Sequence, residues 1–139
     1  EHNVYGITRD TTGQYVIVFD EFSSRSSRYG KCTQCKKYNT SGAWCQSCDP
    51  FEITQGWTSG NNDIDDYIKE IQLKTTEYEH VIEWIPFDRL YNLQKVDESR
   101  LQALWLDGIR KVKSRTESHT VDLKIFDGLQ VDALEFIRN

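Results

Sequence analysis

The chain has 139 residues and a formal net charge of −5, with 37% hydrophobic and 28% charged residues. This length suits one domain, or one domain with a small module, and leaves room for a buried core. The acidic balance excludes the whole chain as a general binder of polyanions, so any contact with nucleic acid has to be local. No stretch approaches the roughly eighteen apolar residues of a membrane span, and we expect no membrane partner.

Residues 1–22 contain two apolar runs, 4–8 and 15–22, around a turn rich in Asp, Thr and Gly. This pattern predicts a β-hairpin. The second run has four consecutive apolar residues, Val16 to Phe19, instead of an alternating pattern. Such a run is typical of a strand that is covered on both faces, so the hairpin needs a partner.

Residues 23–56 hold every cysteine of the chain, arranged as two Cys-x-x-Cys pairs. The four are Cys32, Cys35, Cys45 and Cys48. Two such turns supply the closed shell of four thiolates that structural zinc takes. The segment contains no fifth cysteine and no histidine, so no coordination position is left open for a reacting water. The alternatives are disulfides, which belong to secreted chains, and redox chemistry, which normally uses a single pair beside a βαβ unit. We therefore predict a structural zinc ion in a small module of the zinc-ribbon type.

The zinc segment is also basic, since no acid lies between Phe22 and Asp49. Its basic residues are Arg25, Arg28, Lys31, Lys36 and Lys37. They either compensate the thiolate charge or form a binding face with Tyr29, Tyr38 and Trp44 between them. The spacing around Asn39 resembles the zinc fingers of Ran-binding-protein type, which bind single-stranded RNA or ubiquitin. The gap between the half-sites is one residue shorter than in that family, and its leading tryptophan is absent.

Residues 57–83 predict a connecting helix. Asn62 is the expected N-cap, and three aspartates follow it in the first turn, where acids favour a helix. Apolar residues then recur at helical spacing, at Ile64, Tyr67, Ile68, Ile71 and Tyr78. The three acids could also suggest a metal site, but solvated acids in a first turn are far commoner.

Residues 84–139 predict three strands and a helix. The expected strands are 90–96, 101–106 and 121–126, with a charged loop over 111–118, and the expected terminal helix is 130–137. This is also the order of elements at the start of a protein-kinase small lobe.

Four motifs carry a resemblance to a known family: the paired Cys-x-x-Cys, the Trp-Thr-Ser-Gly-Asn stretch from Trp57, the octapeptide 83–90 and Trp105–Gly108. In this order they resemble the kinase-like family expanded in arbuscular mycorrhizal fungi, in which a zinc segment precedes a tyrosine-kinase-like domain. The resemblance implies that Lys124 stands where that family has its nucleotide-binding lysine, and that Glu135 is its partner on helix C. In the other interpretation, Lys124 is an ordinary lysine at the edge of a strand and Glu135 is a solvated acid on a helix, with no nucleotide site between them.

Departures from the kinase pattern bear on activity. Residues 96–101 stand where a glycine-rich phosphate loop is expected, but they contain no glycine and include Asp97 and Glu98. The chain has no His-Arg-Asp and no Asp-Phe-Gly motif. We therefore expect no phosphoryl transfer by these residues, no catalytic residue and no bound ATP.

The order of elements suggests how the hairpin is covered. Residues 4–8 and 15–19 resemble kinase strands four and five, yet here they precede strands one to three. We hypothesise an α+β fold in which hairpin 4–22 completes a five-stranded antiparallel sheet with 90–126. The completion occurs within a permuted monomer or between the chains of a domain-swapped dimer, unless the chain is a junction of two tandem kinase fragments.

The expected function is that of a non-catalytic, kinase-derived scaffold or interaction module, stabilised by zinc and binding a protein partner in the cytoplasm. One alternative is a zinc-finger module that binds single-stranded RNA or ubiquitin through the basic segment. Another is part of an active ATP-dependent protein kinase whose large lobe lies outside these residues.

Overall fold

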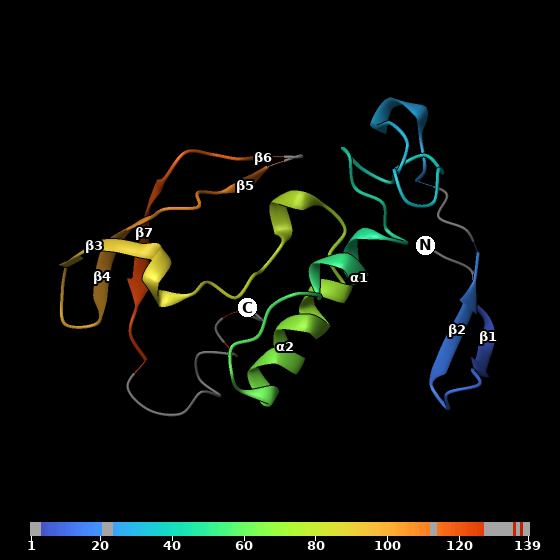
Figure 1. Ribbon diagram of the computed structural model, residues 1–139, viewed down its shortest axis with the longest axis horizontal. Coiled ribbons are helices and arrows are strands. Elements are labelled where there is room, and N and C mark those ends of the chain that lie inside the picture. Colours follow the sequence, from blue (N-terminus) through green and yellow to red (C-terminus); the bar gives the residue numbers. More distant parts are fainter. Residues whose placement is uncertain (1–3, 21–23, 112–113, 127–134, 136, 138–139) are drawn as a thin grey trace.

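A computed structural model describes residues 4–20, 24–111, 114–126, 135 and 137. The fold is α+β and its sheets are antiparallel, as expected. The β1–β2 hairpin lies at one end, a three-stranded sheet lies at the other, and helices α1 and α2 lie between them (Figure 1). Within the described residues, no helix has the length and apolar character that a membrane span requires.

The hairpin joins β1 (Val4–Arg9) to β2 (Tyr15–Phe19). Its turn depends on the Asp10 carboxylate, which accepts hydrogen bonds from the backbone N–H groups of Thr12 (2.8 Å) and Gln14 (2.9 Å). Gly13 takes a positive φ of 90°, which costs glycine little. The predicted turn chemistry is therefore present, but every residue of both strands is exposed.

The main sheet has the order β3-β4-β7. Its strands are β3 (Leu90–Lys95), β4 (Arg100–Trp105) and β7 (His119–Lys124). The central strand buries Ala103, which is 3% exposed, and pairs with β7 over six consecutive residues. The β3 strand is bulged after Tyr91, where Asn92 takes a positive φ of 53°.

The expected five-stranded sheet is not confirmed. Among the described residues, β1 and β2 pair only with each other, and the main sheet has three strands. The zinc segment and α2 follow the hairpin in the chain and separate it from the main sheet (Figure 1). Of the predicted terminal helix 130–137, the structure describes Glu135 and Ile137, both helical, and the rest lies outside the described residues.

Helix α2 (Asn62–Leu73) begins one residue earlier than predicted and ends earlier too. Its N-cap is Asn61, whose side-chain oxygen accepts from the N–H groups of Asp63 (2.9 Å) and Ile64 (3.2 Å). The helix does not reach Tyr78, which instead starts the 3-10 turn η2 (Tyr78–His80). Similar turns form η1 (Ser27–Tyr29) and η3 (Phe87–Arg89). Helix α1 (Asp49–Ile53) is short and carries Pro50 in its first turn.

The buried Asp65 of α2 organises the loop that precedes the helix. Its carboxylate accepts hydrogen bonds from the Thr58 hydroxyl and from the backbone N–H (2.7 Å) and hydroxyl of Ser59. The Ser59 and Thr58 hydrogen bonds lower the pKa of Asp65. Asp65 therefore has a structural role. It lies in the first turn of the helix as expected, but it is buried and not solvated.

We expect Asp65→Asn to lower the melting temperature at pH 7, because an amide cannot accept the same hydrogen bonds. The folded pKa of Asp65 is depressed, so its stabilisation is present above the unfolded value of about 3.9 and is lost as pH falls through the folded pKa. The melting temperatures of the unmodified chain and of Asp65→Asn, measured between pH 7 and pH 3, should therefore approach each other as the pH falls. The control is Asp66→Asn, at an exposed position of the same helix. Its melting temperature should stay close to that of the unmodified chain at every pH in this range.

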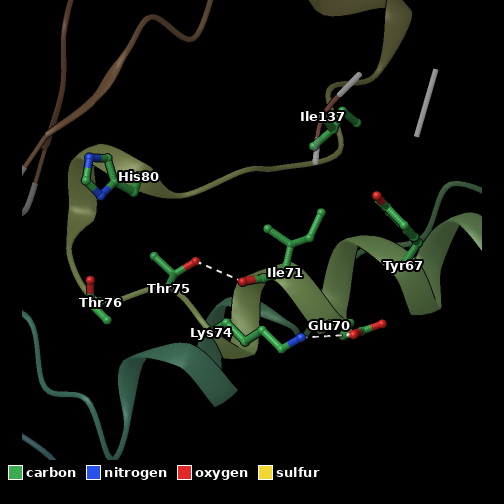
Figure 2. Close-up of a pocket in the computed structure, with 8 residues that line it drawn as sticks. All are labelled: Tyr67, Glu70, Ile71, Lys74, Thr75, Thr76, His80 and Ile137. Carbon is green, nitrogen blue, oxygen red and sulfur yellow. Dashed lines mark hydrogen bonds and ion pairs between the residues drawn. The ribbon is translucent and has the colours of Figure 1, made fainter. Parts of the chain in front are cut away.

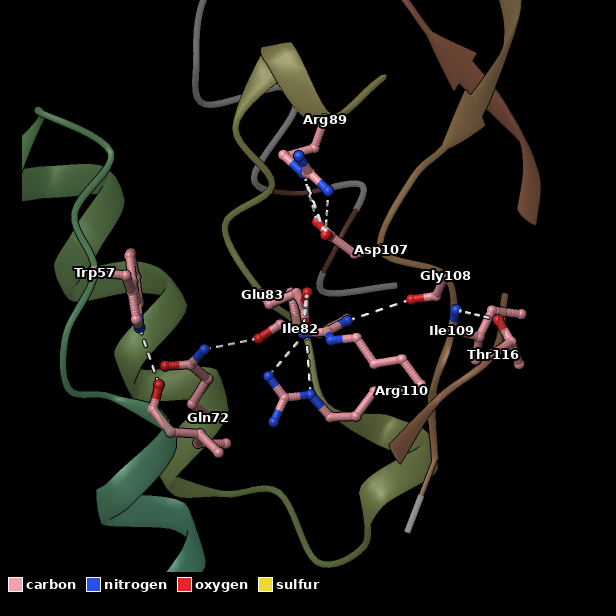
Figure 3. Close-up of polar contacts among 12 residues, drawn as sticks. Trp57, Gln72, Ile82, Glu83, Arg89, Asp107, Gly108, Ile109, Arg110 and Thr116 are labelled. Carbon is pink, nitrogen blue, oxygen red and sulfur yellow. Dashed lines mark hydrogen bonds and ion pairs between the residues drawn. The ribbon is translucent and has the colours of Figure 1, made fainter. Parts of the chain in front are cut away.

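Polar contacts join the segment after α2 to the loops of the main sheet (Figure 3). Gln72, which is buried, donates to the Ile82 carbonyl (2.8 Å), and Glu83 forms ion pairs with Arg110 (3.1 Å) and Arg115 (2.9 Å). These two arginines belong to a short hairpin, β5 (Arg110–Lys111) and β6 (Ser114–Arg115), which begins one residue before the region 111–118 that was expected to be a loop.

Gly108 closes the turn before this short hairpin. It takes a φ of 72°, and a Cβ built on it would lie 2.3 Å from the Glu117 carbonyl oxygen. Only glycine fits such a close backbone approach. Beside it, the Arg89 guanidinium makes a two-nitrogen contact with the Asp107 carboxylate at 2.9–3.3 Å (Figure 3).

Candidate metal centre

The first half-site is a tight turn that carries Cys32 and Cys35. Cys32 donates its N–H to the Lys37 carbonyl (2.8 Å), and its own carbonyl accepts from the N–H of Lys36 (3.0 Å). Lys36 takes a positive φ of 65°, and the chain then reverses so that Lys31 and Tyr38 form a β-bridge. The reversal presents both sulfurs on the same side of the turn.

The second half-site carries Cys45 and Cys48 and leads directly into α1. The Cys45 carbonyl accepts from the N–H groups of Cys48 (3.1 Å) and Asp49 (2.9 Å), and Asp49 accepts from the Cys45 N–H (2.6 Å). Ala43 takes a positive φ of 52° in the turn just before this half-site. The helix thus begins where the second pair of sulfurs is presented.

The structure brings all four predicted sulfurs together. Their Sγ atoms lie within 4.8 Å of one another, and those of Cys35 and Cys45 are 3.7 Å apart. A tetrahedral Zn²⁺ with bonds of about 2.3 Å has sulfur–sulfur edges of about 3.8 Å. The four cysteines are free thiols, and Cys32 and Cys45 are buried. The donor set therefore fits a structural metal ion of the zinc type and does not form disulfides.

A cation already compensates charge at this cluster. The Arg25 guanidinium lies 3.6 Å from the Cys45 sulfur and also donates to the Tyr38 carbonyl (2.6 Å) and the Ser47 hydroxyl (2.8 Å). Burial alone would raise the pKa of the Cys45 thiol, but hydrogen bonds from Arg25 and the backbone lower it to about 7. Burial and the other three sulfurs raise the pKa of Cys48 to about 12. A divalent metal would bring the remaining thiols to the thiolate form.

The sequence prediction missed the centre of the small core beside the metal site. Trp44, which one of the two interpretations placed in a basic binding face, is 0% exposed. Its ring meets Tyr78 edge-on at 5.1 Å, and its Nε1–H donates to the Gln46 side chain (3.1 Å). Its position directly before Cys45 was the one available signal, because a large aromatic residue that adjoins a metal ligand is held close to the metal site.

Two hydrogen bonds fix the zinc segment to the chain that follows α2. The Gln46 side chain donates to the Thr75 carbonyl (2.8 Å), and the Ser41 hydroxyl donates to that of Thr76 (3.3 Å). Together with the contact between Trp44 and Tyr78, they join a metal-binding loop to the segment that follows α2, which is about thirty residues away in sequence.

Two interpretations of the basic residues were open, namely charge compensation at the sulfurs and an exposed binding face, and different residues fit each of them. Arg28 stacks over the Tyr29 ring at 4.7 Å and Lys31 over the Tyr38 ring at 5.5 Å, while the Lys36 ammonium donates to the Thr33 carbonyl (2.6 Å). Arg25 thus compensates charge at the sulfurs, whereas Arg28 and Lys31 are exposed on aromatic faces.

The proposed relic of a nucleotide site lies far from the metal centre in sequence. Lys124 ends β7, and its ammonium lies 5.4 Å from the centre of the Phe126 ring. Glu135 is helical and exposed. Where a phosphate loop was considered, Arg100 pairs with Asp97 (2.8 Å), and this hydrogen bond lowers the pKa of Asp97 to about 2. Glu98 likewise pairs with Lys95 (3.3 Å), so both cations beside this turn already hold a carboxylate where a phosphate would need a positive charge.

A cavity of about 350 Å³ lies beside α2 (Figure 2). Tyr67, Ile71 and His80 line it together with Ile137, and the ion pair between Glu70 and Lys74 (3.0 Å) forms part of its rim. Thr75 closes one side by donating to the Ile71 carbonyl (3.2 Å). The lining is mixed and holds no set of groups arranged for proton transfer or nucleophilic attack.

Comparisons with protein-family models, curated proteins and solved structures found no match to this chain. Its function is therefore argued from the geometry of its own residues.

Proposed function

We propose that the chain is a non-catalytic interaction module whose zinc segment is held in shape by one structural zinc ion. The observation that carries this proposal is the closed cluster of four sulfurs within 4.8 Å, with buried Trp44 beside it. All four ligand positions are sulfur, so no open position remains for a substrate or an activated water. The metal would contribute folding free energy, and recognition would fall to the surface that it organises.

We also propose that β3, β4 and β7 derive from a kinase small lobe that has lost its activity. In support, Lys124 lies on the third of three antiparallel strands, and the turn between the first two bears Asp97 and Glu98. Phosphoryl transfer depends on positioning and on stabilising the phosphate charge, which these two acids oppose. The proposed role for this sheet is therefore that of a scaffold for a protein partner.

Native mass spectrometry before and after acid release tests the metal part of this proposal. One zinc ion per chain supports it, whereas a metal-free chain overturns it. A thermal-shift titration with ATP and Mg²⁺ tests the absence of nucleotide binding, and we expect no shift. A shift that disappears in Lys124→Met would restore nucleotide binding, and Lys111→Met is the matched control at another exposed lysine.

A second candidate function is the binding of single-stranded RNA by the zinc segment. The observation in its favour is the pair of exposed stacks, Arg28 on Tyr29 and Lys31 on Tyr38. Such surfaces bind phosphates through the cations and bases through the rings. A mobility-shift assay in rising salt distinguishes it, because phosphate binding weakens steeply with salt. Lys31→Gln should weaken a true complex, whereas Lys69→Gln, at the stack on Trp57, should not.

A further inference from the structure

The β1–β2 hairpin is the most apolar exposed surface among the described residues. Its large apolar side chains are 41–70% exposed. They are Val4, Tyr5, Ile7, Tyr15, Val16, Ile17, Val18 and Phe19. A two-stranded hairpin alone is marginally stable in water, so one with both faces wet requires a cover. These eight side chains present on the order of 800 Å² per copy, about what each partner contributes to a standard interface.

Among the described residues, the main sheet has one regular edge strand that can accept a further strand. Edge β3 is interrupted by its bulge at Asn92, a feature that protects an edge from further pairing. Edge β7 is regular, and Ile125 continues its register by donating to the Ser99 carbonyl (2.8 Å). Because hydrogen-bonded pairs alternate along an antiparallel ladder, Thr120, Asp122 and Lys124 direct their backbone groups away from β4.

The hairpin also has one regular edge. Strand β1 has a register shift between Val4 and Gly6, whereas β2 is uninterrupted. The hydrogen bond from Asp10 to the Gln14 carbonyl (2.8 Å) sets the alternation, so that Tyr15 and Ile17 direct their backbone groups away from β1.

The two regular edges fit each other. If they pair in the antiparallel direction through their outward backbone groups, Val16 and Val18 fall on the same face as Val121 and Leu123. These two β7 residues are half-buried and flank the sheet face that buries Ala103. The β2 strand carries no charge, and the β7 edge carries both signs in Asp122 and Lys124, so no like-charge repulsion opposes the pairing.

Within one chain these edges lie at opposite ends of the molecule, with α1 and α2 between them (Figure 1). We propose that β2 of one copy adds to β7 of a second copy, and that the exchange is reciprocal. Each hairpin is then covered and each β7 edge is paired, which gives a closed, two-fold dimer with a five-stranded sheet at each end. The dimer accounts for the run of four apolar residues in β2, and it goes beyond the proposed function because it depends on neither RNA nor nucleotide.

The test is the solution mass of the zinc-loaded full chain by light scattering over a concentration series. We expect a species of about twice the 16.3 kDa chain mass that dissociates on dilution. Ile17→Pro and Asp122→Pro each remove one outward N–H and spare the ladder inside the hairpin or the sheet, so each should give a monomer. Lys95→Pro is the matched control, because the backbone N–H of Lys95 faces away from β4 on the bulged β3 edge. This variant should remain a dimer.

Zinc content and near-ultraviolet circular dichroism identify variants that keep the zinc segment folded. Where Ile17→Pro loses both, Val18→Lys replaces it, because a lysine leaves the β2 backbone intact and places a charge on the face that Val18 would share with Val121 and Leu123. Mixing the Ile17→Pro and Asp122→Pro variants should give a dimer weaker than that of the unmodified chain. The intact β2 of the Asp122 variant can pair with the intact β7 of the Ile17 variant, while the reciprocal contact stays broken. A chain that stays monomeric at every concentration overturns the proposal. So does a dimer that Ile17→Pro dissolves and Asp122→Pro leaves intact, because hairpins would then pair with hairpins.

Discussion

Cys45→Ser is expected to abolish metal binding and to unfold the zinc segment, residues 24–56. Cys45 is 0% exposed and receives a contact from the half-buried Arg25, so its loss removes a metal ligand together with this contact. Structural zinc contributes an apparent 10–16 kcal/mol or so in small zinc-binding peptides, which matches or exceeds the whole stability of a typical domain, about 5–15 kcal/mol. No set of contacts within so short a segment can replace that contribution.

The measurement is zinc content together with near-ultraviolet circular dichroism, which reports the fixed packing of aromatic rings such as Trp44. A chelator should produce the same change in the unmodified chain, and added Zn²⁺ should reverse it. Thr33→Ala, at an exposed position between two ligands, is the control and should bind one zinc ion normally. A Cys45→Ser protein with an unchanged aromatic signal would contradict the assignment of folding free energy to the metal.

Trp44→Ala is expected to destabilise the protein by about 3–5 kcal/mol, the usual range for removing a buried tryptophan. Trp44 is fully buried, packs edge-on against Tyr78 and hydrogen-bonds to Gln46. Its removal leaves a cavity beside the sulfur cluster and breaks the contact that joins this cluster to the chain after α2. Urea titration of the zinc-loaded protein measures the loss as a change in the midpoint.

Phe87→Ala is the matched control for this substitution. Phe87 is 70% exposed, so its removal should change the free energy of unfolding by about 0.5 kcal/mol or less. Equal losses at the two positions would show that Trp44 is not the centre of the small core. A loss at Trp44 together with a normal zinc content would place the effect in packing and not in metal binding.

Features that depend on local chemistry could be predicted from the sequence. Two Cys-x-x-Cys turns place their sulfurs by backbone geometry alone, and the Asp10 to Gly13 turn determines the hairpin in the same way. The helix start was wrong by one residue, because Asn61 and Asn62 are both capable caps and only the Asp65 interactions with the preceding loop select between them.

Features that depend on distant contacts could not be predicted. The sequence suggested Trp44 as an exposed aromatic residue because basic neighbours surround it, but Tyr78, which covers it, follows a helix that lies between them. The five-stranded sheet required the hairpin and the main sheet to lie on the same side of α2, and nothing in the local sequence specifies that side. The Lys111 to Ser118 region was considered a loop because it is charged, yet Glu83 forms ion pairs with Arg110 and Arg115, one on each strand of the short hairpin that forms there.

The hydrogen bonds from Gln46 and Ser41 to the Thr75 and Thr76 carbonyls have a consequence for the lifetime of the chain in a cell. They join the end of α2 to the loop that carries the four sulfurs. If this loop takes its shape from the proposed zinc ion, loss of the ion would expose Trp44 and Tyr78 together and would open the backbone before and after the helix to proteases. The amount of intact protein would then follow the zinc supply.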